Sequence, residues 1–80
     1  MKLPRNVFGS DLVKGLERVG YTRTRQKGGH LYMTTQQNGE HHVAVPLHKP
    51  VKVGTLNAIL SSVAEHLQTD REQSLDSMKL

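Results

Sequence analysis

The stretch that decides the fold is HLYMTTQQNGEHHVAVP, residues 30–46. Hydrophobic residues recur at every second position on both sides of its Asn-Gly pair, at Leu31 and Met33 before it and at Val43 and Val45 after it. This alternation is typical of strands with one buried face, and Asn-Gly is the strongest short hairpin signal. The final proline ends the second strand because proline cannot donate to a sheet ladder. The stretch therefore predicts two antiparallel strands.

A third strand is predicted just before it. The segment YTRTRQ, residues 21–26, is rich in Thr and Tyr, which suit strands. Arg23, Arg25 and Lys27 follow one another at spacing two, so we expect them on one face of this strand, where they would form a row for backbone phosphates. An edge strand protected from aggregation by its charge explains them equally well.

Helical spacing appears on both sides of the strands. A first helix is predicted between Ser10, a good N-cap, and Gly20, a C-cap glycine, and a second helix follows Thr55. Thr69 and Glu72 fit a capping box, which is compatible with a last short helix whose weakly patterned tail we expect to fray. The apolar faces consist of Leu12, Val13, Leu16 and Val19, and of Leu56, Ile59, Leu60, Val63 and Leu67.

The predicted order is helix, three strands, helix, in one small α+β domain. We expect this domain over residues 1–67 and a C-terminal extension over residues 68–80. Both helices should cover the sheet face that carries the alternating hydrophobic residues. His30, Tyr32 and Thr34 then lie on the opposite, open face.

Composition limits the class of protein. The 80 residues include no cysteine, which excludes disulfides and cysteine-based zinc sites, and no apolar run is long enough to cross a membrane. We expect a soluble, cytoplasmic protein. The net charge of +4 is uneven: residues 1–54 hold nine basic and three acidic residues, and residues 55–80 hold two basic and four acidic ones. A positive N-terminal part favours a polyanion such as RNA, although ordinary solubility also explains it.

His30 is the candidate for chemistry. It follows Gly28 and Gly29, which permit close approach of a ligand to the backbone, and it has Lys27 and Arg25 nearby for phosphate contacts. It is the only residue on its face that is suited to proton transfer near neutral pH. A histidine that merely opens a strand is the plainer interpretation, and the residues alone leave both open.

The other histidines give little support for a metal site. His41 and His42 are adjacent in a strand and point to opposite faces, so they cannot chelate one ion together. His48 and His66 lie on a loop and on the second helix, without the spacing of zinc ligands, and we expect no metal or other cofactor. Tyr32 is a candidate for stacking on a base or a plain strand residue.

Three segments together resemble the HicA family, the small mRNA-cleaving toxins of toxin–antitoxin pairs. KLPRNVFGSDLVKGLERVGY is similar to the start of the family, RQKGGHLYM to its Lys-Gly-Ser-His segment, and VAVPLHKPVKVGTLNAIL to its Val-Pro-x-His loop and following helix. The resemblance covers roughly residues 2 to 64. The sequence departs from the family at Gly29, where a serine is usual, and at Leu31, where a second histidine is frequent.

The resemblance implies a fold like that of double-stranded-RNA-binding domains, α-β-β-β-α. It implies metal-independent endoribonuclease activity on mRNA, with His30 as the catalytic residue. Arg23, Arg25, Lys27, Gly28, Gly29 and Tyr32 would be the RNA contacts. It also implies a protein that is monomeric when free and is neutralised in a heteromeric complex with a HicB-type antitoxin. A non-catalytic RNA-binding module using the same face, or a structural partner of another protein, are the alternatives.

Overall fold

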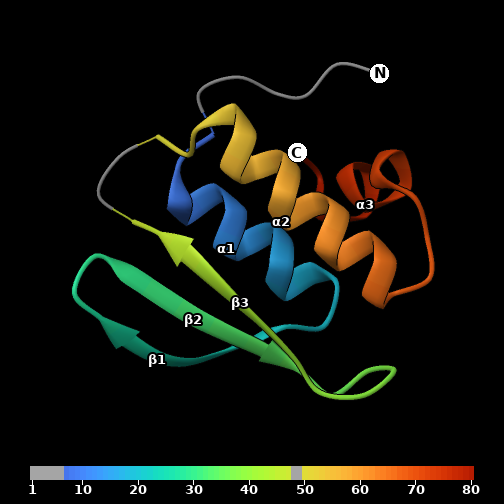
Figure 1. Cartoon of the computed structure of the whole chain (residues 1–80), viewed down its shortest axis with the longest axis horizontal. Coiled ribbons are helices and arrows are strands. Elements are labelled where there is room, and N and C mark those ends of the chain that lie inside the picture. The colour runs from blue at the N-terminus through green and yellow to red at the C-terminus, as the bar shows by residue number, and fades with distance from the viewer. Residues whose placement is uncertain (1–6, 48–49) are drawn as a thin grey trace.

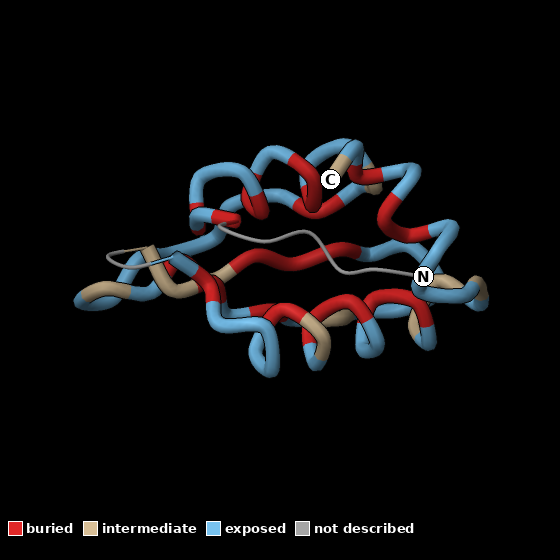
Figure 2. The backbone as a smooth tube through the Cα atoms, turned by 90° about the horizontal axis from the view of Figure 1, so that it is seen from above, coloured by how far each residue is buried: buried red, intermediate tan, exposed pale blue. Residues whose placement is uncertain are grey.

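The computed structural model describes residues 7–47 and 50–80. The α+β fold predicted from the sequence is confirmed, with the helices packed on one face of a three-stranded antiparallel sheet (Figures 1 and 2). Figure 2 shows the buried residues of the helices turned toward the inside. The elements, in chain order, are α1 Gly9–Arg18, β1 Thr22–Lys27, β2 His30–Thr35, β3 His41–Pro46, α2 Val53–His66 and α3 Arg71–Met78.

β2 is the central strand of the sheet, whose order is β1-β2-β3. Leu31 pairs with Val45 and Met33 pairs with Val43, and all four side chains are buried. Because side chains directly opposite each other in an antiparallel pair share one face, these four form the helix-covered face. The predicted core face of the sheet is therefore confirmed.

Both hairpin loops contain residues with a left-handed backbone. Gly28 has φ 58° in the two-residue loop between β1 and β2, and Asn38 and Gly39 have φ 55° and 99° in the loop between β2 and β3. Glycine and, to a lesser degree, asparagine tolerate these values. The hairpin predicted at Asn38-Gly39 is confirmed, and the tight first loop places Lys27 directly opposite His30.

α1 begins earlier than the sequence predicts. Phe8 is the N-cap, and its backbone N–H donates to Asp11 Oδ2 at 3.2 Å. Ser10 therefore lies inside the first turn, and its predicted role as N-cap is wrong. The Asp11 carboxylate, at the third helical position, thus bonds the N–H of the N-cap residue, which is one half of a capping box.

The end of α1 agrees with the prediction. Gly20 has φ 102°, and its N–H donates to the Glu17 carbonyl while the N–H of Tyr21 donates to the Leu16 carbonyl. This is the Schellman arrangement, in which glycine closes a helix and the next residue packs back onto it. Tyr21 is 1% exposed as a result.

α2 and α3 begin at caps other than those predicted. Lys52 precedes α2, so Thr55 is not the N-cap, and the apolar stripe of α2 is nevertheless buried as expected. The N-cap of α3 is Asp70, whose Oδ1 accepts from the Gln73 N–H at 2.8 Å. Thr69 instead donates from its Oγ1 to the Gln73 side chain.

α3 is part of the core, and the expectation of a fraying tail is wrong over Arg71–Met78. Leu75 and Met78 are 8% and 0% exposed. Met78 lies against Gly15, where a Cβ atom would come within 2.9 Å of the Met78 Cβ. Arg18 Nη1 donates to the Met78 carbonyl at 3.0 Å and so ties the end of α3 to α1.

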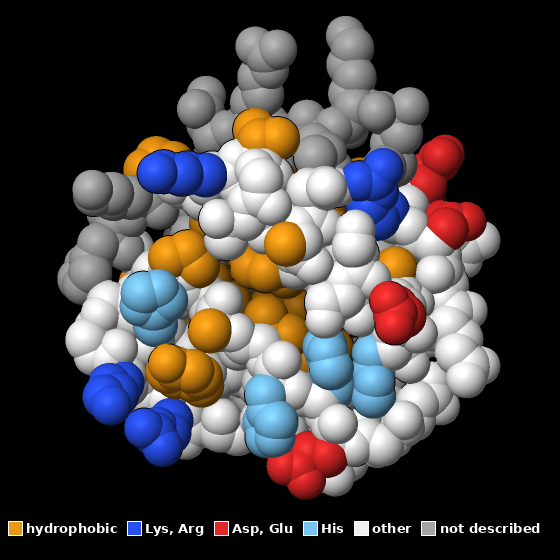
Figure 3. Space-filling view, viewed as in Figure 1, with side chains coloured by type: hydrophobic (Ala, Val, Ile, Leu, Met, Phe, Trp, Pro, Cys, Tyr) orange, Lys and Arg blue, Asp and Glu red, His pale blue; other side chains and the backbone are white. Residues whose placement is uncertain are grey.

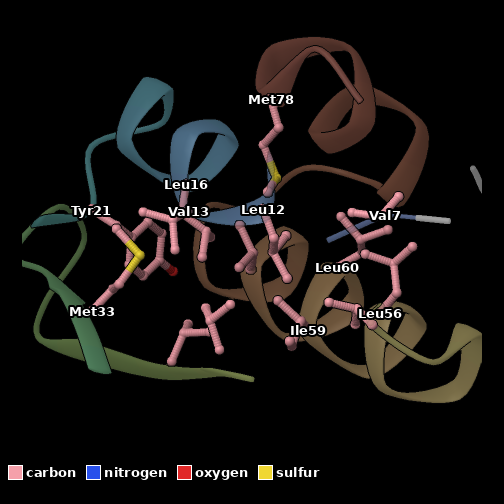
Figure 4. Packing of buried hydrophobic residues seen from close by; sticks show 14 of the residues in the cluster. Val7, Leu12, Val13, Leu16, Tyr21, Met33, Leu56, Ile59, Leu60 and Met78 are labelled. Atoms are coloured by element: carbon pink, nitrogen blue, oxygen red, sulfur yellow. The ribbon is translucent and has the colours of Figure 1, made fainter. Parts of the chain in front are cut away.

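The core is almost entirely aliphatic and joins all three helices to the sheet (Figure 4). Its fully buried members come from α1, β2, β3, α2 and α3, and Tyr21 is its aromatic residue. Figure 4 shows Met78 reaching down toward Leu12 from the opposite helix. Its fully buried side chains include Leu12, Leu16, Met33, Val45, Leu56, Leu60, Val63 and Met78.

We expect Met78→Ala to lower the free energy of unfolding by about 2–5 kcal/mol, because it leaves a cavity between α1 and α3. Denaturant unfolding monitored by circular dichroism measures this. Asp76→Ala, an exposed position in the same helix, serves as the control and should change stability by less than about 0.5 kcal/mol. Equal stability of the two variants would mean that α3 does not pack on the core in solution.

Candidate nucleic-acid interface

The open face of the sheet carries the residues that the sequence singled out. Along β2, His30, Tyr32 and Thr34 point away from the helices, because the residues between them are buried against the helices. Lys and Arg side chains lie on this side of the molecule, over β1 and the β1–β2 loop (Figure 3, lower left). The predicted placement of these three residues is confirmed.

His30 lies at one end of this face. It is exposed, it pairs with Lys27 on one side and with Pro46 on the other, and it directly follows the Gly28-Gly29 loop. Within residues 7–47 and 50–80 its ring takes part in no side-chain hydrogen bond or ion pair. An exposed imidazole of this kind is free to bind a ligand or to exchange a proton with one.

Tyr32 lies next to His30 on the same face and is half-buried. The Arg25 guanidinium carbon is 5.7 Å from the centre of the Tyr32 ring, within the range of a cation–π contact. On the other side Tyr32 pairs with Ala44, whose side chain is small. An aromatic ring and a guanidinium side by side are a common surface for stacking a nucleic-acid base.

The predicted row of three cations is wrong at Arg23. The pairing of β1 with β2 shifts between Arg23 and Arg25, as in a β-bulge, so that Arg23 pairs with Met33 and Arg25 with Tyr32. Met33 belongs to the core face, and Arg23 accordingly forms an ion pair with Glu17 of α1 at 3.4 Å. Arg25 and Lys27 share the open face, whereas Arg23 lies on the opposite side.

Thr24, the extra residue at the bulge, stabilises this irregular backbone. Its Oγ1 donates to the Tyr32 carbonyl at 3.0 Å and lies 3.5 Å from Thr34 Oγ1. Bulges turn a strand and re-aim the side chains that follow. This bulge sets the direction of Arg25 and cannot be recognised from alternation alone.

The other end of the open face carries an acidic residue. Thr34 Oγ1 and His42 Nδ1 are 2.8 Å apart, and His42 Nε2 is 2.8 Å from Glu40 Oε2. Thr34 is therefore 8% exposed although it points away from the core. The face is positive near His30 and negative near Glu40, a polarity that the sequence analysis missed.

His41 lies on the helix side, so the prediction that His41 and His42 point to opposite faces is confirmed. Its Nδ1 is 2.7 Å from the Tyr21 hydroxyl and its Nε2 is 3.0 Å from Ser62 Oγ. Its ring stacks on that of His66 with 4.5 Å between the centroids. His66 Nε2 donates to the carbonyls of Gln37 and Gly39 and so holds the β2–β3 loop against α2.

Burial raises the pKa of the Tyr21 hydroxyl, so this group stays protonated and donates to His41 Nδ1. Burial also lowers the pKa of the His41 imidazole, and the neighbouring His66 and His42 lower it further. His41 is thus neutral, with its proton on Nε2 directed at Ser62. His41 and His66 thus tie β3 and the loop before it to α2, a structural role that the sequence analysis did not predict.

Residues 7–47 and 50–80 contain no group of three metal-ligating side chains that could hold an ion. His48, which the sequence analysis placed on a loop, lies outside the described residues. The same part of the chain holds no helix with the length and apolar character that a membrane span requires.

Comparison with known protein families finds a family model that matches most of the chain. Residues 9–64 match the family model described as the HicA toxin of bacterial toxin–antitoxin systems. This segment contains α1, the whole sheet and most of α2. No curated protein and no solved structure matches the chain.

We expect the fold to lose stability on acidification because of His41. In the unfolded chain the His41 imidazole takes up a proton near pH 6.5, whereas in the folded protein it takes up that proton only at a lower pH. Stability should therefore be full above about pH 6.5 and fall below that value until the pKa of the folded state is passed. Melting temperatures between pH 7.5 and 5 measure this.

The matched variants are His41→Gln and His42→Gln. The first should be less stable at pH 7.5 and should flatten the acid-side decline, because its side chain does not titrate. The second, on the open face, removes only the last and smallest of the three causes that lower the pKa of His41, so it should keep most of the decline. If the decline survives in His41→Gln, His41 is not its source.

Proposed function

We propose that this chain, which belongs to the HicA toxin family of bacterial toxin–antitoxin systems, is an endoribonuclease that cleaves mRNA without a metal ion. The observation that carries the proposal is the exposed His30 ring, free of side-chain partners in the described residues, beside Lys27 and the Gly28-Gly29 loop. An acid–base group next to a cation and to backbone N–H donors is the combination that favours phosphodiester cleavage.

His30 would act on the ribose that precedes the cleaved bond. As general base it takes the proton of the 2′-hydroxyl, whose oxygen attacks the adjacent phosphorus while the bond to the 5′-oxygen breaks. As general acid it gives a proton to that leaving 5′-oxygen. Either step leaves a 2′,3′-cyclic phosphate and a 5′-hydroxyl, and such help is worth about 10²–10⁴-fold in rate.

Lys27 and the loop would bind the phosphate during this reaction. Lys27 pairs with His30 across the sheet, and a Cβ atom built on Gly28 would meet no atom within 4 Å, so the backbone of the loop is open on that side. A cation and backbone N–H groups offset the charge that develops on the phosphate oxygens. Gly29 stands where the family usually has serine, so a hydroxyl contact to phosphate would be missing and the rate correspondingly lower.

The substrate would be single-stranded RNA. Tyr32 and Arg25 offer a stacking surface for a base next to His30, and a base is accessible to such a surface only when it is unpaired. The attack by the 2′-hydroxyl restricts cleavage to RNA. Glu40 at the far end repels phosphates and favours binding at the His30 end.

An uncontrolled ribonuclease is harmful to its cell, and we propose a HicB-type antitoxin as the partner that restrains it. The family implies an antitoxin in general. The cations Arg25 and Lys27 would suit an acidic surface of that protein. The chain would be a monomer when free and part of a heteromeric complex when neutralised.

A non-catalytic RNA-binding module is the second candidate. It is favoured by the fact that the described residues place His30, and no second acid or base, beside Lys27 at this end of the face. Binding in that case would depend on Arg25 and Lys27 and would not depend on His30.

The decisive variant is His30→Ala, assayed on a long single-stranded RNA in EDTA. We expect cleavage to fall about 10²–10⁴-fold because the acid–base group is lost. The melting temperature and the RNA affinity should stay near those of the parent because the side chain is exposed. His42→Ala is the control on the same face. Cleavage that persists in His30→Ala would show that His30 is not the catalytic residue. RNA that is bound by both proteins and cleaved by neither would favour the binding module.

A second comparison uses Arg25→Ala and Arg23→Ala. We expect Arg25→Ala to weaken RNA binding and to reduce the salt dependence by about 0.7 in the slope of log K against log salt, as for one phosphate contact. Arg23→Ala should leave binding nearly unchanged, since Arg23 lies on the helix side. Titrations from 50 to 200 mM salt measure both. If Arg23→Ala weakened RNA binding as much as Arg25→Ala, Arg23 would be an RNA contact, as predicted from the sequence.

A further inference from the structure

β3 has an unpaired edge whose free backbone groups can be assigned. In an antiparallel ladder the residues of an edge strand alternate between bonding to their neighbour and pointing outward. The N–H of Leu47 donates to the Gly29 carbonyl at 2.7 Å, which extends the register in which Val45 pairs with Leu31. The residues between the bonded positions, His42 and Ala44, therefore direct their N–H and C=O groups away from β2.

A groove runs along this edge. One wall is His42, Val43 and Ala44 of β3, and the other is formed by α2. Figure 3 shows hydrophobic side chains in a hollow between β3 and α2. The residues of α2 that line it are Ala58, Ile59 and Ser62.

The shape of the groove follows from small side chains. Ala58 and Ser62 are four residues apart and so share one face of the helix, where they keep that wall low. Val43 and Ile59, 6% and 8% exposed, form its apolar part. The bond between His41 and Ser62 ties β3 to α2 just beyond His42 and closes the groove at that end.

We infer that this groove receives an extended segment of the antitoxin, which adds to the sheet as a fourth strand beside β3; the inference rests on the antitoxin partner proposed above. The outward N–H and C=O groups of His42 and Ala44 would form hydrogen bonds with the backbone of the antitoxin segment. The apolar part of the groove would bind an aliphatic side chain of that segment. Strand addition between a sheet edge and a helix is a recurring way of binding peptides.

RNA is a poor occupant of the groove. None of its lining residues is a lysine or an arginine, and His42 is paired with Glu40. Phosphate binding needs cations, which this face of the molecule carries at the His30 end instead. The groove and the RNA-binding surface are thus chemically distinct although both include β3.

A second copy of this chain is also a poor occupant. Two antiparallel β3 strands would be related by a two-fold axis perpendicular to the joined sheet, so both α2 helices would lie on the same side of it. Each α2 borders the edge of its own β3, and both would compete for the space over the junction. A lone extended segment brings no such helix with it.

A strand in this position would bring the antitoxin to the open face. Ala44 pairs with Tyr32, and Pro46, at the end of β3, pairs with His30. A partner strand bonded to the outer side of β3 is therefore separated from Tyr32 on β2 by β3 alone, and from Lys27 on β1 by β3 and β2. Docking at the edge would fix its orientation while another part of it covers His30.

The test is amide hydrogen exchange, read by NMR, on the chain alone and in complex with the HicB-type antitoxin encoded with it. We expect the amides of His42 and Ala44 to exchange at least tenfold more slowly in the complex. Unchanged exchange at both amides in a complex that forms would overturn the inference while leaving the antitoxin partner in place. The absence of any complex would overturn both.

Proline variants supply the matched binding test. Ala44→Pro removes an outward N–H without removing a bond to β2, and we expect at least tenfold weaker binding of the antitoxin by calorimetry. Gln26→Pro does the same at the β1 edge, where Lys27 and His30 form the bonded pair of the tight hairpin, and should bind like the parent. Equal affinity of Ala44→Pro and the parent would overturn the inference.

Two further outcomes identify other occupants. Protection of the His42 and Ala44 amides by the chain alone, rising with its concentration, would assign the edge to a second copy. Protection of the same amides by a single-stranded RNA would assign it to the substrate. Either result would overturn the inference, and the exchange measurement on the unmodified protein decides even where a proline variant fails to fold.

Discussion

The side chains of β2 alternate between two environments, and the position of every other element follows from that alternation. Met33 is fully buried under the helices, whereas Tyr32 beside it faces the opposite side. A slip of one residue in the pairing would expose Leu31 and Met33 and bury His30. Each of those two apolar side chains contributes about 1.5–3 kcal/mol when buried. Hydrophobic burial on one face therefore holds His30 at the surface of the other.

The imidazole group of histidine has two roles in this small fold, because the surroundings of His41 and His30 differ. His41 is partly buried between Tyr21 and Ser62, which fix its neutral form and its tautomer, and it acts as a tie between β3 and α2. His30 is exposed and unengaged in the described residues. A histidine that is fully bonded within the protein has no free nitrogen for a ligand. Only the second arrangement leaves an imidazole available for chemistry.

Much of the fold could be predicted because it depends on local rules. Alternation fixed the faces of β2 and β3, Asn38-Gly39 fixed their hairpin, and Gly20 fixed the end of α1. The exposed position of His30 followed from the same periodicity. These features need no knowledge of distant contacts, which explains why they survive in the structure.

The features that could not be predicted depend on contacts between distant residues. The bulge at Thr24 exists because its hydroxyl bonds across to β2, and it moves Arg23 to the helix side. The burial of Met78 depends on Gly15, which lacks a side chain to keep α3 away. The helices begin at other residues than predicted because several nearby residues can cap a helix. At the start of α1 it is the Asp11 carboxylate that bonds, to the N–H of Phe8. Propensity cannot rank such alternatives without the tertiary structure.

The two edges of the sheet differ in a way that separates their tasks. β1 is exposed at every residue, carries Arg23, Arg25 and Lys27, and is bent by a bulge, and each of these features discourages pairing with another strand. β3 has no lysine or arginine and no bulge in its pairing with β2, and a helix lies beside its outer edge. A sheet that needed only to bind RNA would gain nothing from leaving this uncharged edge unpaired. The asymmetry is understandable if cations at one edge meet phosphates while the neutral backbone of the other meets a polypeptide, so that substrate and partner are recognised by different chemistry on one three-stranded sheet.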